Sequence, residues 1–364
     1  MTARVPASGR GATANPDSRY SAQQRESFDD GWPADDPLPP IRTQVGVDSS
    51  RTVISYNQSP DVPFDRSVNP YRGCEHGCIY CYARPTHAWL GLSPGLDFET
   101  RLFSKPDAAA QLERELAAPA YRPAPLALGA NTDPYQPVER RLGVTRSVLQ
   151  VLHDCSHPLV VTTKSALVLR DLDLLRPMAE RHLAAVLVSV TTLDAALARR
   201  LEPRAASPQR RIEAIRALAK SGIPVGVLVS PVIPGLTDMD LERILERAAD
   251  AGATRAGSLL VRLPMETADL FEDWLRRHEP DRADRVLSLI RQCRGGRLND
   301  PRFGTRMSGC GPVAELLAQR FRLAARRAGL TRGTDDRAVD WDLDCSRFSP
   351  PRPPGTQLGL FDDV

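Results

Sequence analysis

The sequence of 364 residues lacks an apolar run long enough to span a bilayer, and its N-terminus lacks the apolar core of a secretory signal. It also lacks a strong net charge, because the formal charge is only +3 and 26% of the residues are charged. Its seven cysteines are an odd number, which argues against a framework of disulfides and for a reducing compartment. These absences predict an ordinary globular protein of the cytoplasm that has no membrane association.

Three of the cysteines, Cys74, Cys78 and Cys81, fall within eight residues and are spaced C-x3-C-x2-C. Thiolates on so short a loop can converge on one metal centre, and Gly73 and Gly77 allow the backbone to fold tightly around it. A zinc site normally takes a fourth protein ligand, but no second C-x2-C pair lies downstream to supply one. The pattern predicts a [4Fe-4S] cluster with one iron left open, and a structural zinc knuckle is the alternative.

Short apolar runs alternate with amphipathic patterns along the middle of the chain. After a short first strand near Ser67, the predicted strands lie at 126–129, 159–163, 185–190, 225–229 and 258–263. The predicted helices lie near 106–118, 144–154, 167–181, 208–220, 238–251 and 267–278. Such alternation indicates parallel strands with right-handed crossovers, so six repeats predict an α/β fold with an open six-stranded partial TIM barrel.

Composition sets the expected boundaries of the chain. Residues 1–51 have no hydrophobic period and contain turn-forming prolines, so we expect a disordered arm that precedes a barrel at 52–295. Residues 296–330 form a basic C-terminal extension with a predicted helix, and residues 331–364 form a flexible tail. A proline-rich spacer at 350–354 is stiff and extended, so it presents the last residues of the chain.

The cysteine motif, with aromatic Tyr80 just before its third cysteine, resembles the signature of the radical S-adenosylmethionine (SAM) superfamily. In that family the open iron chelates the methionine moiety of SAM, and the aromatic residue lies near the adenine. The resemblance implies the partial barrel, a [4Fe-4S] cluster and SAM as cofactors, and cleavage of SAM to a 5′-deoxyadenosyl radical. It also implies a low-potential electron donor of the ferredoxin or flavodoxin type. A non-catalytic iron–sulfur module is the competing class.

Within the superfamily, residues 52–330 resemble the branch that contains spore photoproduct lyase and its bacterial relatives. The matching segments are Tyr71–Arg84, Asn131–Glu139, Thr163–Ser165, Leu201–Pro203, Ser230–Asp238 and Leu298–Arg306. The lyase binds SAM through a lysine and a serine that match Lys164 and Ser189. It also has a hydrogen-donating cysteine in the loop after strand two, where residues 129–132 of this chain contain none. The lyase reaction itself is therefore not implied.

Polar residues follow several predicted strands, at the end where barrels of this kind carry their working face. Lys164 ends the third strand and supplies a cation for the carboxylate of SAM, while Ser189 and Thr191 end the fourth and supply hydroxyls for the carboxylate or ribose. Each residue alone has the alternative of satisfying local backbone groups. Their common placement on one rim favours a role in binding SAM.

Two of the remaining cysteines differ in their surroundings. Cys155 lies just before the third strand, at the opposite end of the barrel from the working face, where a core cysteine is expected. Cys310 lies between Gly309 and Gly311, which expose it, and it follows a segment that the family shares. It is a candidate hydrogen or electron donor, and the alternative is an ordinary loop cysteine.

Residues 293–332 carry nine arginines against two acidic residues, a net charge of +7 that suits phosphate. One predicted helix there carries Arg320, Arg326 and Arg327. The apolar face with which we expect this helix to pack on the barrel is formed by Leu316, Leu317, Phe321 and Leu323. With the lyase resemblance, the segment predicts a nucleic-acid substrate, such as a damaged or modified base. The alternatives are that the arginines only solvate the helix, and that the substrate is a peptide or small metabolite.

The chain ends with Gln357-Leu358-Gly359-Leu360-Phe361, which resembles the motif that binds the bacterial replication sliding clamp. In that motif the glutamine amide enters a polar subsite and the leucine–phenylalanine pair fills an apolar pocket. Two large apolar residues in a polar tail are costly unless something covers them. The sequence therefore predicts the clamp as a partner through Gln357, Leu358, Leu360 and Phe361, and the alternative is that Leu360 and Phe361 fold back on the barrel.

Overall fold

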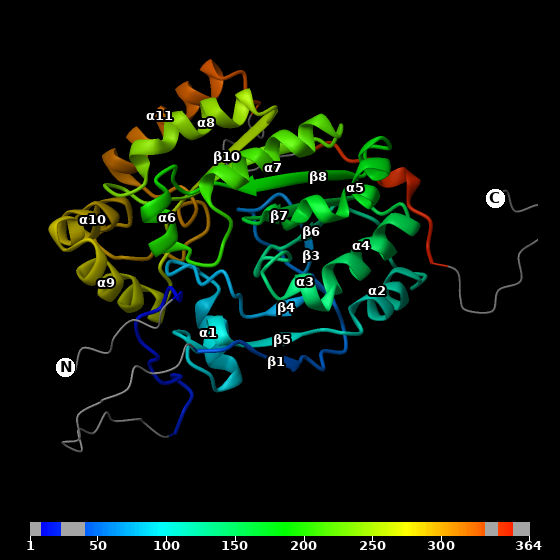
Figure 1. The fold of residues 1–364 in the computed structure, drawn as a ribbon, viewed down its shortest axis with the longest axis horizontal. Coiled ribbons are helices and arrows are strands. Elements are labelled where there is room, and N and C mark those ends of the chain that lie inside the picture. Colours follow the sequence, from blue (N-terminus) through cyan, green and yellow to red (C-terminus); the bar gives the residue numbers. More distant parts are fainter. Residues whose placement is uncertain (1–8, 23–40, 332–340, 352–364) are drawn as a thin grey trace, which may run out of the picture.

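A parallel sheet forms the centre of the computed structural model, which describes residues 9–22, 41–331 and 341–351. The strands lie in the order β10-β9-β8-β7-β6-β3, and β2 (Ile54–Tyr56) adds an antiparallel strand beside β3. The parallel strands are β3 (Arg66–Val68), β6 (Leu126–Leu128), β7 (Leu159–Thr163), β8 (Ala184–Ser189), β9 (Val225–Val232) and β10 (Arg255–Leu260). Helices cover one face of the sheet (Figure 1). The predicted open six-stranded partial barrel is confirmed.

The connecting helices follow the predicted pattern. They are α2 (Ala108–Leu116), α4 (Val144–Asp154), α5 (Leu172–Ala179), α6 (Ala195–Leu201), α7 (Pro208–Lys220) and α8 (Leu241–Asp250), of which only α6 was not predicted. In α7, Ser207 caps the first turn and Pro208 takes the first helical position. Its residues Ile212, Ile215 and Leu218 are at most 2% exposed and join the core. Two short helices, α1 (Asp97–Thr100) and α3 (Glu139–Leu142), complete the connections.

In the described part of the chain, three α-helices follow β10. They are α9 (Glu266–His278), α10 (Pro280–Cys293) and α11 (Gly311–Arg327), of which α10 was not predicted. Strand β10 itself begins three residues before the predicted apolar run. Among the described residues, no helix combines the length and the apolar composition that a membrane span requires.

Part of the N-terminal arm is ordered, which corrects the expectation of disorder over residues 1–51. Gly11 and Ala12 donate their backbone N–H groups to the buried carboxylate of Glu99 at 2.9 and 2.8 Å. The arm also lies directly on the cysteine loop, because a Cβ atom at Gly11 would be 1.8 Å from the carbonyl oxygen of Gly77. Sequence periodicity misses this contact because hydrogen bonds, rather than a repeating apolar face, hold the arm.

A second, smaller sheet joins the residues after the N-terminal arm to the strand that precedes the cysteine loop. Strand β1 (Gln44–Val47) pairs in parallel with β5 (Arg101–Ser104), and β5 pairs antiparallel with β4 (Tyr71–Arg72). Strand β4 ends directly before the cysteine motif. The small sheet therefore fixes the start of the loop against residues that precede the barrel.

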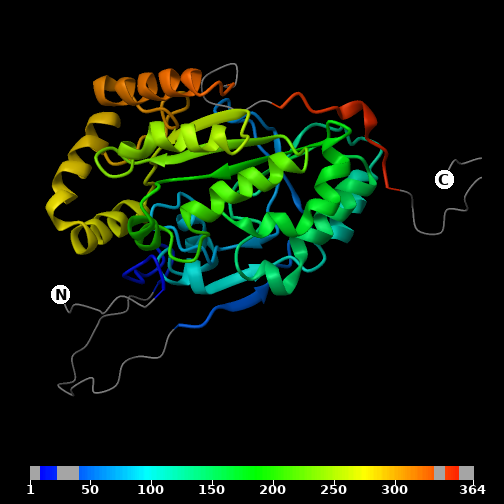
Figure 2. The same cartoon turned by 45° about the horizontal axis from the view of Figure 1, so that its top comes forward.

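Part of the expected flexible tail, 331–364, is also ordered. In the C-terminal segment 341–351, Trp341 packs on Ala185 of the sheet, and the guanidinium of Arg255 lies 5.1 Å from the Trp341 ring. Figures 1 and 2 show this segment at the end of the sheet opposite to the ordered part of the N-terminal arm. The two ends of the described chain thus lie on opposite sides of the barrel.

The C-terminal segment covers a small aromatic cluster at the amino ends of the strands. Cys155 is buried there, as predicted, and its carbonyl accepts a hydrogen bond from Ser349 N–H at 2.9 Å. The rings of Tyr121, His157 and Phe348 lie 5.3 to 5.8 Å apart. Nδ1 of His157 donates to the Pro158 carbonyl, so Nε2 accepts from the Tyr121 hydroxyl at 2.6 Å. The fold thus holds a neutral imidazole.

Acidification is expected to weaken the fold through His157. Burial lowers the pKa of His157 to about 4, so the unfolded chain binds more protons below the ordinary pKa of about 6.5. Stability is therefore complete above pH 6.5 and falls as the pH drops toward 4, by about 2 kcal/mol at pH 5. Urea unfolding of wild type and His157→Gln at pH 6.5 and at pH 5 measures this loss of stability. An equal loss in both proteins would show that other groups cause it.

Helix α11 (Gly311–Arg327) packs on the barrel with a different face from the one expected. Leu317 and Phe321 are buried as predicted, but Leu316 and Leu323 are 55% and 44% exposed. Alanines, rather than these leucines, complete the buried face, and they are Ala314, Ala324 and Ala325. These small side chains let the helix pack close to β10 and α8. The sequence prediction assigned the buried face from the large apolar residues alone, and it therefore included Leu316 and Leu323.

Several arginines in and just before the basic C-terminal extension are engaged within the protein. Arg294 is buried and donates to four backbone carbonyls. Ion pairs join Arg302 to Asp300, Arg306 to Asp61, and Arg320 to Asp238 and Glu242. Arg320 therefore anchors α11 to α8 and is not available to a phosphate, which corrects its expected role. Counting charges along the chain does not reveal such pairing.

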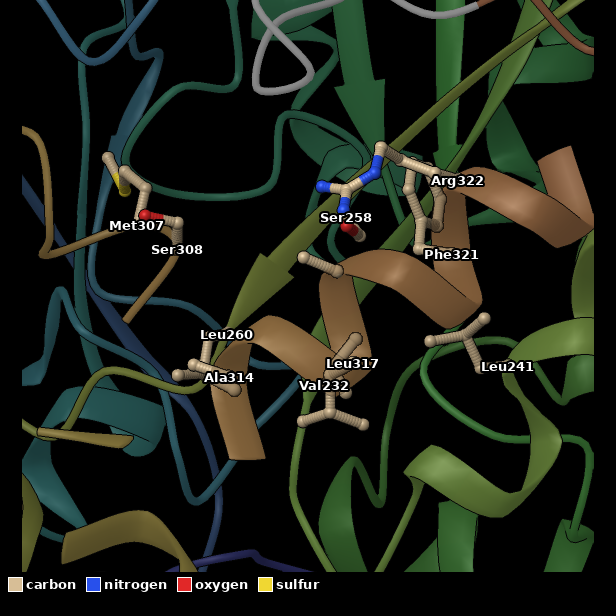
Figure 3. Close-up of a pocket in the computed structure, with 11 residues that line it drawn as sticks. Val232, Leu241, Ser258, Leu260, Met307, Ser308, Ala314, Leu317, Phe321 and Arg322 are labelled. Carbon is tan, nitrogen blue, oxygen red and sulfur yellow. The ribbon is translucent and has the colours of Figure 1, made fainter. Parts of the chain in front are cut away.

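A cavity of about 230 Å³ lies between α11 and the last two strands. Figure 3 shows Leu317 of α11 near Val232 and Ala314 of α11 near Leu260, while Arg322 and Ser258 lie toward the other end. None of the predicted site residues is among the described residues that line it. The cavity is thus separate from the candidate site.

Candidate active site

The three motif cysteines lie on a loop that follows β4. Cys74 and Cys78 are buried, Cys81 is partly buried, and none of the three forms a disulfide. Gly73 and Gly77 have φ values of +75° and +66°, the left-handed region that favours glycine. The loop therefore turns at the two glycines, as the sequence predicts.

Burial raises the pKa of all three thiols, and neighbouring acidic groups, such as Glu202 beside Cys78, add to this for two of them. Buried thiols stay ionised only beside positive charge, which a metal centre supplies. Among the described residues, no group of three or more His, Cys, Asp and Glu side chains is placed to hold a metal ion. A [4Fe-4S] cluster takes one thiolate per iron, so three free thiols on one loop fit its donor set. The cluster itself stays a prediction.

The predicted rim residues meet around the ammonium group of Lys164, which directly follows β7. Lys164 Nζ lies 2.6 Å from Ser189 Oγ, 2.9 Å from the carbonyl oxygen of Ser230 and 3.3 Å from Thr191 Oγ1. These partners come from the carboxyl ends of β8 and β9. Burial lowers the pKa of Lys164 to about 8, while the nearby Cys78 acts in the opposite direction. The strand ends thus form one polar cluster.

A buried carboxylate, Glu202, completes this cluster, which we call the Lys164 network. Glu202 accepts hydrogen bonds from the hydroxyls of Tyr80 and Thr191 and from the guanidinium of Arg211. Its Oε1 atom lies 3.3 Å from Lys164 Nζ. Two cations therefore share one carboxylate. The network also fixes Tyr80, whose ring lies 5.8 Å from the Lys164 ammonium.

A contact between His76 and Asp133 ties the cysteine loop to the sheet. His76, inside the motif, lies with Nδ1 3.3 Å from Oδ2 of Asp133 in the loop after β6. Asp133 also accepts hydrogen bonds from the Thr163 hydroxyl and the Lys164 N–H, both at 2.7 Å. Burial alone would raise the pKa of Asp133, but His76 and these hydrogen bonds hold it below the ordinary value. The loop is thus held beside the Lys164 network.

Cys310 is hydrogen-bonded outside the Lys164 network. It directly precedes α11, and its Sγ atom lies 3.7 Å from the carbonyl oxygen of Cys293. Its exposure is intermediate, and Gly309 and Gly311 both have positive φ. Within the described part of the chain, no hydrogen bond joins Cys310 to Lys164 or its partners. The role of Cys310 as a hydrogen or electron donor stays a prediction.

Two arginine–aromatic pairs lie close to the cysteine loop. The guanidinium of Arg262 lies 5.4 Å from the ring of Tyr82, the residue after the third cysteine. The guanidinium of Arg306 lies 4.5 Å from the ring of Phe303 and pairs with Asp61. Tyr82 and Phe303 are 43% and 61% exposed, and the buried Nε atom of Arg262 has no hydrogen-bond partner. These pairs offer flat apolar surface beside positive charge.

Several residues of the site escaped the sequence patterns. Glu202 directly follows helix α6, and Arg211 lies within helix α7. Neither residue is at the end of a strand, so the rule that places site residues at strand ends misses both. The segment Leu201–Pro203, which resembles the spore photoproduct lyase branch, was the sequence feature that could have pointed to Glu202. Arg262 lies two residues beyond β10 and is not part of any recognised motif.

Comparison with known proteins identifies relatives of the chain. A family model described as the Radical SAM superfamily matches residues 68–248. The uncharacterized proteins Rv2578c of Mycobacterium tuberculosis and Mb2609c of Mycobacterium bovis are each 39% identical over 233 residues, which cover 64% of this chain and 68% of theirs. The uncharacterized protein MJ0683 of Methanocaldococcus jannaschii is 28% identical over 173 residues, which cover 48% of this chain and 62% of that protein.

Solved structures share the fold. Spore photoproduct lyase complexed with dinucleoside spore photoproduct has a TM-score of 0.57 and 16% identity, over 81% of this chain and 82% of that chain. A mutant of the lyase with bound AdoMet and the same dinucleoside has a TM-score of 0.56 and 17% identity, over 79% and 80%. At this level of identity the similarity concerns the fold.

Proposed function

The chain belongs to the radical SAM superfamily, and on this premise we propose that it acts on a nucleic acid that carries a damaged or modified base. Membership makes it a radical SAM enzyme and implies SAM and an iron–sulfur cluster as cofactors. The observation that carries the choice of substrate is the pair of exposed rings, Tyr82 and Phe303, each beside an arginine near the cysteine loop.

The residues that would hold the cofactors fit them. Cys74, Cys78 and Cys81 offer three free thiols, and no disulfide competes for them. When both cofactors are bound and an external donor has supplied one electron, they would cleave SAM to methionine and a 5′-deoxyadenosyl radical that abstracts a hydrogen atom from the substrate. The chain positions this chemistry and keeps water away from it.

The Lys164 network is suited to the carboxylate of SAM. Within the network the two cations Lys164 and Arg211 share one carboxylate, that of Glu202. The carboxylate of SAM would balance the remaining positive charge. The hydroxyls of Ser189 and Thr191 lie within hydrogen-bonding distance of the ammonium and keep it aimed at one point. In this proposal the role of Lys164 is to orient SAM through the N–H donors of its ammonium group.

Single-stranded or flipped bases stack on exposed aromatic side chains, which contribute about 1–3 kcal/mol per base. Tyr82 and Phe303 provide such rings. Arg262, whose guanidinium lies beside the Tyr82 ring, offers a positive charge to a phosphate. The lyase with the similar fold has been solved with a dinucleoside photoproduct, which supports the same class of substrate. A peptide or small metabolite would not need these groups.

Transfer of hydrogen from the substrate tests the proposal directly. The reconstituted protein is reduced anaerobically with dithionite in the presence of SAM and deuterium-labelled oligonucleotides that carry modified bases. Deuterium in 5′-deoxyadenosine, measured by mass spectrometry, is the expected result. Deuterium transfer from labelled peptides or metabolites, with none from any oligonucleotide, would assign the enzyme to the alternative substrate class.

Replacing Arg262 with glutamine is expected to weaken binding of a single-stranded oligonucleotide about tenfold, because one charged phosphate contact is lost. The slope of log affinity against log salt concentration should fall by about 0.7, the value for one phosphate of a single strand. Fluorescence anisotropy of a labelled oligonucleotide at several salt concentrations measures both quantities.

The matched control is Arg297→Gln, which removes an exposed arginine from the basic C-terminal extension. Its affinity should stay within about twofold of wild type, since exposed charges contribute little. Equal effects of the two substitutions would mean that total charge, rather than the Arg262 site, governs binding. Wild-type affinity that does not change with salt would contradict the nucleic-acid proposal.

Docking on the replication sliding clamp remains a separate proposal. Its motif, residues 357–361, lies outside the described residues. A peptide of residues 350–364 is expected to bind purified bacterial clamp with a dissociation constant on the order of micromolar, through the leucine–phenylalanine pair. Isothermal titration calorimetry measures this, and the double substitution Leu360→Ala with Phe361→Ala should abolish it. A wild-type peptide that fails to bind ends the proposal.

A further inference from the structure

A pocket of about 450 Å³ lies beside the cysteine loop, and basic residues dominate its walls. Four arginines line it, namely Arg10, Arg42, Arg141 and Arg204, together with the single carboxylate of Glu75. The pocket therefore has an excess of positive charge. The protein as a whole has a formal charge of only +3, so this concentration of arginines is a local feature.

Hydrogen bonds fix the inner part of the pocket. Arg204 Nη2 lies 3.2 Å from Glu75 Oε1, and the Thr43 hydroxyl donates to the same oxygen. Arg10 is buried and donates to Thr43 Oγ1 and the Ile41 carbonyl. Burial and the charge of Arg204 lower the pKa of Arg10, which shows that the two cations lie close together. The ordered part of the N-terminal arm thus builds one wall.

The outer part of the pocket faces solvent. Arg42 and Arg141 are exposed, and Ile41 is 42% exposed beside them. Neither arginine forms an ion pair with the acidic residues of the described chain segments. The rim therefore presents two cations and an apolar side chain to an incoming partner.

The pocket is joined to the cysteine motif through its inner wall. Glu75 follows Cys74 in the chain, and the N–H of Arg204 donates to the carbonyl oxygen of His76. A protein that docks here therefore comes within one residue of a predicted cluster ligand. The Lys164 network does not contribute to the lining, so a docked partner would leave the SAM site open.

We propose that this pocket is the docking site for an acidic one-electron carrier protein of the flavodoxin or ferredoxin type. The proposal rests on the proposed function, because only a redox-active cluster needs such a carrier. One electron leaves the reduced flavin or iron–sulfur centre of the carrier and enters the cluster held by Cys74, Cys78 and Cys81. No bond forms or breaks in this step and no proton is transferred.

The lining favours a protein over a nucleic acid. None of the described residues that line the pocket is aromatic, whereas single strands bind through stacked rings. Arginines mixed with apolar residues such as Ile41, Pro137 and Val138 are typical of protein interfaces. Electron-transfer complexes are small, and charge complementarity speeds their formation.

The test uses the reconstituted full-length protein with Arg42→Glu and Arg141→Glu, two exposed positions outside the Lys164 network. Purified bacterial flavodoxin is the probe. At low ionic strength the double variant should bind flavodoxin at least tenfold more weakly, measured by calorimetry without substrate. Stopped-flow absorbance should show a similar drop in the rate of reduction by flavodoxin, while the rate with dithionite stays unchanged.

The control carries Arg114→Glu and Arg216→Glu, the same change of charge at exposed positions on α2 and α7. It should bind flavodoxin within about twofold of wild type. Unchanged binding by the pocket variant, or an equal loss in both variants, overturns the proposal. Loss of oligonucleotide binding with intact flavodoxin binding also overturns it and assigns the pocket to nucleic acid. Because binding is measured directly, failure of dithionite-driven SAM cleavage would count against the proposed function alone.

Discussion

Replacing Cys78 with alanine is expected to reduce bound iron and 5′-deoxyadenosine formation to background, at least about 1000-fold below wild type. The chain offers three thiols on the loop, and Cys78 is the one placed beside both Lys164 and Glu202. With two thiolates left, a cluster that already has an open iron loses another ligand. Iron and sulfide content after anaerobic reconstitution, and 5′-deoxyadenosine after addition of dithionite and SAM, are the measurements.

The matched control is Cys155→Ala, which removes another buried cysteine at the opposite end of the strands. Its iron content should equal that of wild type, and its thermal stability should fall only by the cost of a small cavity. Full iron content in Cys78→Ala would show that the loop does not bind the cluster. Zinc in place of iron, lost in the same variant, would favour the zinc knuckle instead.

Replacing Glu202 with alanine is expected to lower the free energy of unfolding by roughly 3–5 kcal/mol, because it leaves charged groups buried without their partner. The Glu202 side chain is fully buried and neutralises Lys164 and Arg211, while it also accepts from the hydroxyls of Tyr80 and Thr191. Urea unfolding followed by circular dichroism at pH 7, on the protein without cofactors, measures the change.

Two further variants separate charge from hydrogen bonding. Glu202→Gln keeps an acceptor for the hydroxyls but not the negative charge, so its loss of stability should lie between those of wild type and Glu202→Ala. Glu213→Ala removes an exposed carboxylate from α7 and should leave stability unchanged. A loss below about 1 kcal/mol in Glu202→Ala would mean that solvent reaches Lys164 and Arg211.

The barrel was predictable because its strands and helices are local patterns. Runs such as 159–163 and 225–229 are short and apolar, and each is followed by a helix with a clear buried face. The two ordered terminal segments were not predictable, because their contacts are remote in the chain. Gly11 bonds to Glu99, and Ser349 bonds to Cys155, and neither pair leaves a periodic pattern.

Some residues of the candidate site could be predicted from the sequence, and others could not. Lys164, Ser189 and Thr191 follow from strand ends and from a family resemblance, and the structure brings them together. Arg320 shows the limit of counting charges, because its ion pairs with α8 depend on how two helices pack. Glu202 could not be found by searching the ends of strands, because it directly follows helix α6.

The contact between the N-terminal arm and the cysteine loop sets an order of assembly. Gly11 lies on Gly77, and Ala12 packs in the same apolar cluster as Cys78, so the closed arm helps to bury the thiols. Iron and sulfide for the predicted cluster would therefore have to reach the loop before the arm packs on it. On the ribosome the arm emerges long before Glu99, its hydrogen-bond partner, so the arm cannot make this contact until Glu99 has been synthesised. Loading of the predicted cluster and completion of the fold would thus be one process rather than two.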